Sequence, residues 1–266
     1  MSRIKSGLGW RRDAPDPRDQ MYSVSLARLQ ALPASVDLTP AFPVYNQGRI
    51  GSCTANALAA AIEFDRLKAG QTPEFTPSRL FIYFNERMIE GDVPLDGGAQ
   101  IRDGVKCLQQ QGVCTENSWP YDDTPAPYEG GPFPVGSRPV TNPPQACYDE
   151  AAEYTITSYQ RLSQTLSQLQ GCLASGYPFV FGFSVFDSWY NSPNPTTTIP
   201  LPSGGDKVIG GHAVLCVGYN NEAQLFKIRN SWGDQVGDNG YFYMPYSYLT
   251  SPNLASDFWV INATKD

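Results

Sequence analysis

Histidine is almost absent from this chain: in 266 residues it occurs once, at position 212. Structural and catalytic zinc sites need several cysteine, histidine or carboxylate ligands at short, recognisable spacings. The six cysteines stand far apart along the chain and form no such pattern, at positions 53, 107, 114, 147, 172 and 216. The sequence therefore predicts no metal site.

Positive charge is also scarce, with 19 basic against 26 acidic residues and a net charge of −7. Nucleic acids and anionic membrane surfaces are bound through basic patches, so neither is an expected partner. The longest apolar run, around residues 178–185, is of strand length and too short to span a membrane. The first twenty residues have no apolar core typical of a signal peptide, which leaves a cytoplasmic location or export by a non-classical route.

Helix formers and strand formers occupy different parts of the chain. The pattern predicts helices over 53–70, 78–90 (opened by Thr76-Pro77) and 101–111, then a helix begun by Ser163 and ending at Gly176. Runs rich in Val, Ile, Phe and Tyr predict strands near 153–162, 179–185, 212–219, 225–229, 240–244 and 258–262. Such segregation indicates an α+β protein rather than a βαβ fold.

The segment from Gln47 to Gly70 places a cysteine at the start of an alanine-rich helix. A turn-forming run ends at Cys53, and the charged residues of the following helix are confined to its second half. The helix is therefore expected to begin inside the protein and to end at its surface. Unpaired N–H groups and the helix dipole at the first turn favour an anion, so we expect Cys53 to lose its proton more easily than an ordinary thiol.

His212 follows two glycines and precedes an apolar run, in Gly-Gly-His-Ala-Val-Leu-Cys-Val-Gly-Tyr. It is the one side chain with an ordinary pKa near neutrality, and a thiol nucleophile needs such a base. A third motif, Asn-Ser-Trp-Gly, begins at Asn230 and includes Trp232. A long Pro, Ser, Gly and Thr loop over 186–210 directly precedes the histidine and is a candidate lid.

Together these segments resemble papain-like cysteine peptidases of the papain/cathepsin family, in a form with a short, bacterial-type propeptide. The matching features are Gln47, the Gly-Ser-Cys that ends at Cys53, the histidine segment and Asn-Ser-Trp-Gly, in family order. Ile50 and Thr54 depart from the family pattern, which usually has Cys and Trp there. The resemblance implies a helical half and a β-barrel-like half with the active-site cleft between them.

The resemblance also implies the roles of the site residues. Cys53 would be the nucleophile of peptide-bond hydrolysis, His212 its proton partner and Asn230 the group that orients the imidazole, with Gln47 a donor to the oxyanion. Trp232 would shield the imidazole from water. Substrate would bind along Gly97 and Gly98 and beside Ala213 and Trp232. The small side chain of Ala213 suggests room for a bulky apolar side chain at P2. No cofactor is implied, only a reducing environment for Cys53.

Residues 33–266 would form the peptidase domain, with a helical half over about 45–125 and a β-rich half over about 145–266. Residues 1–32 would be a short propeptide that blocks the cleft, or else a passive tail. An acyl transferase or ligase of the same mechanism, and a binding protein that has lost activity, are the alternative functions. A free Cys53 leaves five other cysteines; Cys114 could pair with Cys107 or Cys147, and Cys172 also remains open.

Overall fold

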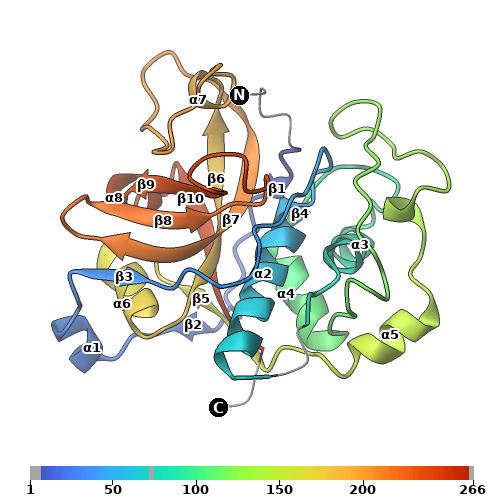
Figure 1. The fold of residues 1–266 in the computed structure, drawn as a ribbon, viewed down its shortest axis with the longest axis horizontal. Coiled ribbons are helices and arrows are strands. Elements are labelled where there is room, and N and C mark those ends of the chain that lie inside the picture. Colours follow the sequence, from blue (N-terminus) through green and yellow to red (C-terminus); the bar gives the residue numbers. More distant parts are fainter. Residues whose placement is uncertain (1–6, 72–74, 264–266) are drawn as a thin grey trace.

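The computed structural model describes residues 7–71 and 75–263, in which helices pack against one face of a curved sheet (Figure 1). The helical half is built from α2 (Cys53–Lys68), α3 (Arg79–Glu90), α4 (Ile101–Gln110) and α5 (Gln145–Ala151). The remaining helices among the described residues are α1 (Leu26–Gln30), α6 (Leu166–Ala174), α7 (Asp187–Tyr190), α8 (Tyr246–Leu249) and a 3-10 turn, η1 (Arg138–Val140). Within these residues no helix is long and apolar enough to cross a membrane.

The other half is a large antiparallel sheet with one parallel pair at its edge. The strands are β2 (Met21–Tyr22), β3 (Ser35–Asp37), β5 (Ser158–Leu162), β6 (Phe179–Phe186), β7 (Val208–Asn220), β8 (Leu225–Arg229), β9 (Tyr241–Pro245) and β10 (Ala255–Asn262). Their order is β2-β5-β10-β6-β7-β8-β9, with β3 also paired to β7. The expected α+β architecture, with a helical half and a β-rich half, is confirmed. Among the described strands the two ends of the sheet, β2 and β9, do not pair, so the β half is an open sheet and not a closed barrel.

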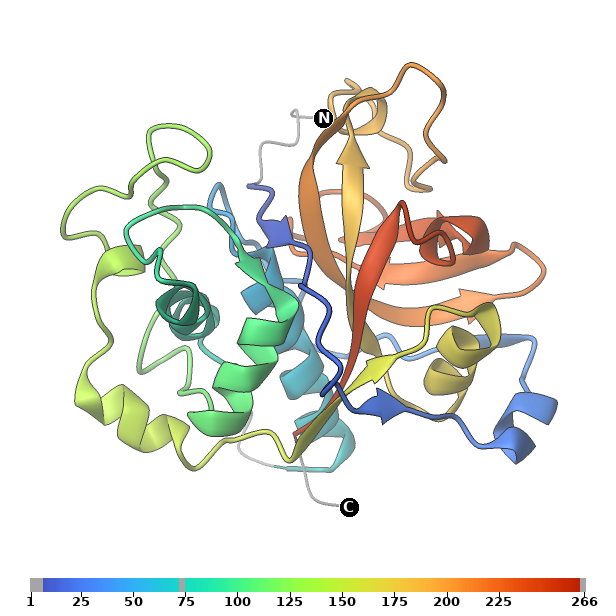
Figure 2. The same ribbon diagram turned by 180° about the vertical axis from the view of Figure 1, so that it is seen from behind.

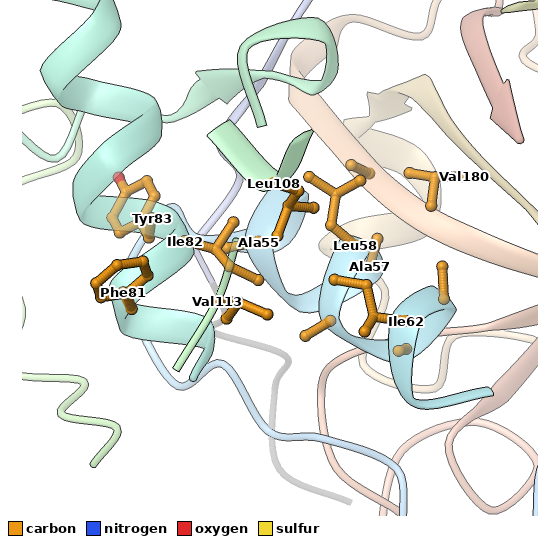
Figure 3. Close-up of a cluster of buried hydrophobic side chains, with 14 of the residues drawn as sticks. Ala55, Ala57, Leu58, Ile62, Phe81, Ile82, Tyr83, Leu108, Val113 and Val180 are labelled. Carbon is orange, nitrogen blue, oxygen red and sulfur yellow. The ribbon is translucent and has the colours of Figure 1, made fainter. Parts of the chain in front are cut away.

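Helix α2 is the central element of the molecule, because it is packed on both sides. In Figure 3, Ile82 and Tyr83 of α3 and Val180 of β6 lie on opposite sides of it. Its five alanines are all buried, at positions 55, 57, 59, 60 and 61. Small side chains let the sheet and the other helices approach the α2 backbone closely, which fixes the position of its first residue.

The helices begin and end close to the expected residues. Gly91 ends α3 in the left-handed conformation, with φ of 75°. The start of α3 differs from the expectation: its N-cap is Ser78, whose hydroxyl accepts a hydrogen bond from the Phe81 N–H, and not Thr76. Helix α5 packs on α3 through the Tyr148 and Phe81 rings, 4.9 Å apart, so it lies with the helical half although it starts at residue 145.

The N-terminal segment crosses the molecule between the two halves. Figure 2 shows it (blue) running between the helices (green) and the sheet (orange to red). Its strand β1 (Trp10–Arg11) pairs in parallel with β4 (Ala99–Gln100), and β2 adds to the edge of the large sheet. The segment is therefore part of the folded structure from residue 7 onward.

Candidate active site

Cys53 is the first residue of α2, and its thiol is fully buried. Burial raises the pKa of this thiol to about 12, although the backbone N–H groups of Ala213 and Gly9 bind the sulfur and act in the opposite direction. The Ala213 contact places the sulfur beside the residue that follows His212. The expected easy loss of the proton is not found in this state, because desolvation outweighs the helix terminus.

His212 and Asn230 are joined by a hydrogen bond of 2.7 Å between Nε2 and Oδ1. An amide oxygen is only an acceptor, so Nε2 carries the proton in this pair. The other ring nitrogen, Nδ1, is buried and has no hydrogen-bond partner in the described part of the chain. Burial lowers the pKa of His212 to about 4, while the Asn230 contact acts to raise it. Cys53 and His212 are thus both neutral in the buried state.

Two indole rings cover the imidazole. The Trp232 ring stacks on the His212 ring, with centroids 4.7 Å apart, and the Trp189 ring stacks on Trp232 at 6.0 Å. Trp189 belongs to α7, in the long loop that precedes β7, and its Nε1 donates to the Thr196 carbonyl oxygen. The aromatic shield therefore has a second layer that the sequence did not reveal.

Gln47 is fully buried and held at both ends of its amide. Its Nε2 donates to the carbonyl oxygens of Gly7 (2.9 Å) and Ile50 (3.0 Å), while its Oε1 accepts from the Ser231 hydroxyl at 2.7 Å. Ser231 follows Asn230 directly, and its backbone N–H donates to Asn230 Oδ1 at 2.7 Å. Ser231 therefore positions the side chains of both Gln47 and Asn230. The side-chain N–H groups of Gln47 are already bound to peptide carbonyl oxygens, including that of Gly7.

The two glycines of residues 97–98 differ in their contacts. A Cβ on Gly98, which has φ of +71°, would lie 1.9 Å from the Gly9 carbonyl oxygen, whereas a Cβ on Gly97 would meet only the Asp92 carboxylate at 3.2 Å. The next N–H, that of Ala99, donates to the Gly9 oxygen at 2.7 Å. Gly98 therefore allows another backbone to approach closely, and that backbone here is residues 7–11.

Trp10 fills a pocket beside Ala213 on the sheet side. Only 7 % of the Trp10 surface is exposed. A Cβ added to Gly182 would lie 1.9 Å from Trp10 Cε2, and one added to Gly211 would lie 2.3 Å from the Trp10 carbonyl oxygen. Since Gly182 pairs with Ala213 in the β6–β7 ladder, the indole occupies the space that these small residues leave open.

A group of charged side chains, which we call the Asp13 clasp, anchors the segment further along. Asp13 Oδ2 accepts from Trp259 Nε1 at 2.9 Å, and the Asp13 N–H donates to Asp257 Oδ2 at 2.8 Å. Arg161 pairs with both carboxylates, at 3.4 Å and 2.6 Å, and Arg102 pairs with Asp19 at 2.5 Å. Asp257 adopts a left-handed backbone conformation with φ of 59°.

The structure thus gathers Gln47, Cys53, His212, Asn230, Ala213 and Trp232 into one buried site and brings Gly98 to its edge through the N-terminal segment. Sequence reasoning missed Ser231, Trp189 and Gly182. The contacts of the N-terminal segment could have been suspected from Trp10, because it is a lone aromatic residue with Gly7 and Gly9 before it and two arginines after it. No group of three or more His, Cys, Asp or Glu side chains suited to a metal ion occurs in residues 7–71 and 75–263.

Three comparisons relate this chain to known proteins. A profile described as "Papain family cysteine protease" matches residues 32–257. An uncharacterized peptidase C1-like protein of Acanthamoeba polyphaga mimivirus is 36% identical, over 100% of this chain and 89% of its own length. The crystal structure of xylellain, a cysteine protease from Xylella fastidiosa, is 54% identical with a TM-score of 0.95, covering 100% and 99% of the two chains. Digestive procathepsin L 3 of Tenebrio molitor shares the fold, with a TM-score of 0.68, 18% identity and coverage of 97% and 76%.

Proposed function

Because the chain belongs to the papain family of cysteine proteases, we propose that it is an endopeptidase whose nucleophile is Cys53. The observation that carries this proposal is the His212–Asn230 hydrogen bond of 2.7 Å beside the Cys53 helix terminus. It fixes the imidazole with Nδ1 unpartnered and available for the thiol. His212, the single histidine of the chain, would thereby act as the proton partner of Cys53, which lies buried at the start of α2.

The proposed reaction is acyl transfer to water. The Cys53 thiolate attacks the peptide carbonyl, and the imidazolium of His212 gives its proton to the leaving amine. Gln47 Nε2 and the Cys53 N–H stabilise the tetrahedral oxyanion, and water then releases the acyl group from the thioester with His212 as base. The 2.9 Å hydrogen bond from Gln47 Nε2 to the Gly7 carbonyl oxygen supports the role of Gln47 as oxyanion donor. In the proposed reaction the oxyanion would take the place of this carbonyl oxygen.

Residues 7–13 would keep the enzyme latent. They supply the carbonyl bound by Gln47, the N–H bound to Cys53, and the indole beside Ala213. With the segment in place Cys53 and His212 are both fully buried, and this desolvation holds both groups in their neutral forms at neutral pH. Departure of the segment would let water or substrate enter, so that the thiolate–imidazolium pair becomes accessible at neutral pH.

The Trp10 pocket supports a preference for a bulky apolar or aromatic P2 side chain. The pocket lies beside Ala213, has Gly182 as its floor and already accepts an indole. The Ala99 N–H would then bind the substrate backbone, as it binds the Gly9 carbonyl, and Gly98 would allow that backbone to approach closely.

Peptide-library cleavage by three full-length proteins tests the proposal: wild type, Gly9→Ala and Cys53→Ala. A Cβ on Gly9 would lie 1.8 Å from the Gly51 carbonyl oxygen, so Gly9→Ala cannot keep the segment in place. We expect faster cleavage by Gly9→Ala than by wild type, with aromatic or large aliphatic P2 residues, and none by Cys53→Ala. Cleavage by Cys53→Ala would assign the reaction to another nucleophile. Equal rates for wild type and Gly9→Ala would make the segment a passive tail.

A further inference from the structure

Two buried thiols outside the active site lie against each other. Cys114, just after α4, and Cys147, on α5, belong to one buried cluster, and each thiol is among the groups that shift the pKa of the other. Both residues are almost fully buried, and both thiols are reduced in this structure. Neither takes part in the site around Cys53.

The backbones around this pair are held in matching positions. The Thr115 N–H donates to Glu150 Oε1 at 3.0 Å, and Glu150 is three residues after Cys147, on the same face of α5. The Cys147 thiol also donates to the Ser118 carbonyl oxygen at 3.6 Å. These contacts hold the segment that follows α4 against the face of α5 that carries Cys147, so the two cysteines lie on facing segments.

The other cysteines are engaged elsewhere. The Cys172 thiol donates to the Tyr177 carbonyl oxygen at 3.3 Å, and the Cys216 thiol to that of Gly218 at 3.8 Å. Cys107 lies on α4, where the nearby carboxyl groups of Glu86 and Asp103 add to the effect of burial on its pKa. Of the two partners that the sequence left open for Cys114, the geometry favours Cys147.

We propose that Cys114 and Cys147 form a disulfide when the chain folds in the presence of a disulfide oxidant such as oxidised glutathione. The two thiols lose two protons and two electrons, the S–S bond forms, and one glutathione disulfide is reduced to two glutathione molecules. Burial raises the pKa of both thiols, which slows thiolate attack once the protein is folded. The bond therefore forms during folding, before α5 covers the pair.

The crosslink would stabilise the helical half without touching the catalytic groups. It closes the loop that contains the Pro- and Gly-rich connector between α4 and α5, at the edge of the helical half in Figure 1. Closing a loop of this size restricts the unfolded chain, and we expect a rise in Tm of roughly 10 °C.

Thiol counting after refolding tests the inference. Full-length Cys53→Ala protein, which cannot digest itself, is refolded with reduced glutathione alone or with a reduced and oxidised glutathione mixture. Free thiols are then alkylated in denaturant, counted by mass spectrometry and located by peptide mapping. We expect five alkylated cysteines in the reduced sample and three in the oxidised sample, because Cys53→Ala leaves five of the six.

Two further variants in the same background identify the pair. Cys107→Ala should still lose two alkylatable thiols on oxidation, whereas Cys147→Ala should lose none. Five free thiols after oxidative refolding, or a peptide that links Cys114 to Cys107, would overturn the inference. If refolding yields are poor, native protein incubated for days with oxidised glutathione gives the same count, since slow opening of α5 admits the oxidant. This inference does not rest on the proposed proteolytic function.

Discussion

The Ser231 hydroxyl donates to Gln47 Oε1 at 2.7 Å and so fixes which end of the Gln47 amide faces the Cys53 helix terminus. With its oxygen engaged by Ser231, the Gln47 amide presents Nε2, which binds the Gly7 carbonyl. Ser231 is therefore a positioning residue for the proposed oxyanion donor. The same residue donates its backbone N–H to Asn230, so it links two groups of the site.

Replacing Ser231 with Ala should lower kcat by roughly 10-fold, less than the ~10²–10³-fold loss expected from deleting the donor itself in Gln47→Ala. KM should change little, because Ser231 makes no direct contact with the proposed substrate path. Steady-state kinetics in the Gly9→Ala background measure both constants. Ser231→Thr, which keeps the hydroxyl, should restore most of kcat; a loss equal to that of Ser231→Ala would show that packing and not hydrogen bonding matters.

Removing the Trp10 side chain should free the active site. A buried Trp→Ala substitution costs about 3–5 kcal/mol, which is more than a 100-fold shift in the docking equilibrium of the segment. We expect Trp10→Ala to speed alkylation of Cys53 by a thiol-directed epoxide and to raise turnover of small peptides. Arg18→Ala is the matched control, because that side chain is 85% exposed and pairs with Asp16 in its own turn. Equal labelling rates for Trp10→Ala and wild type would contradict the expectation.

The Asp13 clasp should make latency depend on pH. Burial, together with repulsion from Asp257, raises the pKa of Asp13 from 3.8 to about 6, although the Trp259 and Arg102 hydrogen bonds act to lower it. A group whose pKa is raised in the docked state favours docking when it is protonated. Protonated Asp13 therefore stabilises docking of the N-terminal segment fully below about pH 4, and this stabilisation is lost as the pH rises through about 6.

The measurement is the ratio of Cys53 labelling rates in wild type and Gly9→Ala at each pH, since the thiol chemistry common to both cancels. This ratio should increase between pH 4 and 7. In Asp13→Asn, which cannot ionise, the ratio should vary much less over the same range. A wild-type ratio that stays flat, or that falls with pH, would refute the role of the clasp.

Gly182 should set the size of the P2 side chain. Its absent Cβ leaves the space in which the Trp10 indole lies. Gly182→Val should reduce kcat/KM for Phe relative to Val at P2 by about 10-fold or more, the usual effect of a few methylenes in an apolar pocket. Paired peptide substrates tested in the Gly9→Ala background give this ratio directly. An unchanged preference would place the P2 side chain elsewhere.

Local patterns were sufficient for the helical elements. The alanine-rich run from Cys53 predicted α2, because small and straight-chain helix formers and a terminating glycine act within a few residues of one another. Gly91 likewise predicted the end of α3, while two possible caps, Thr76 and Ser78, stood too close together for propensity to choose between them. Gln47, Cys53, His212 and Asn230 could be predicted because each lies in a recognisable local motif, and all four are buried in the structure.

What the sequence did not predict depends on contacts between distant residues. Trp189 stacks on Trp232 across 43 positions, and residues 7–13 pack against groups more than 200 positions away. No local periodicity encodes such partners. The pKa of Cys53 also depends on distant residues, because burial in the folded chain raises it while the N–H groups of Gly9 and Ala213, far away in the sequence, act to lower it.

The backbone of residues 7–10 and the site it covers are parts of one polypeptide, joined through β2 and α1. Their encounter is intramolecular, so its extent is set by the length and stiffness of the tether and not by protein concentration. Dilution will not uncover Cys53, however far it is carried. Under the proposed latency, Cys53 is exposed by cutting the tether, by a competing ligand, or by a change that undocks the segment, such as Gly9→Ala or a rise in pH.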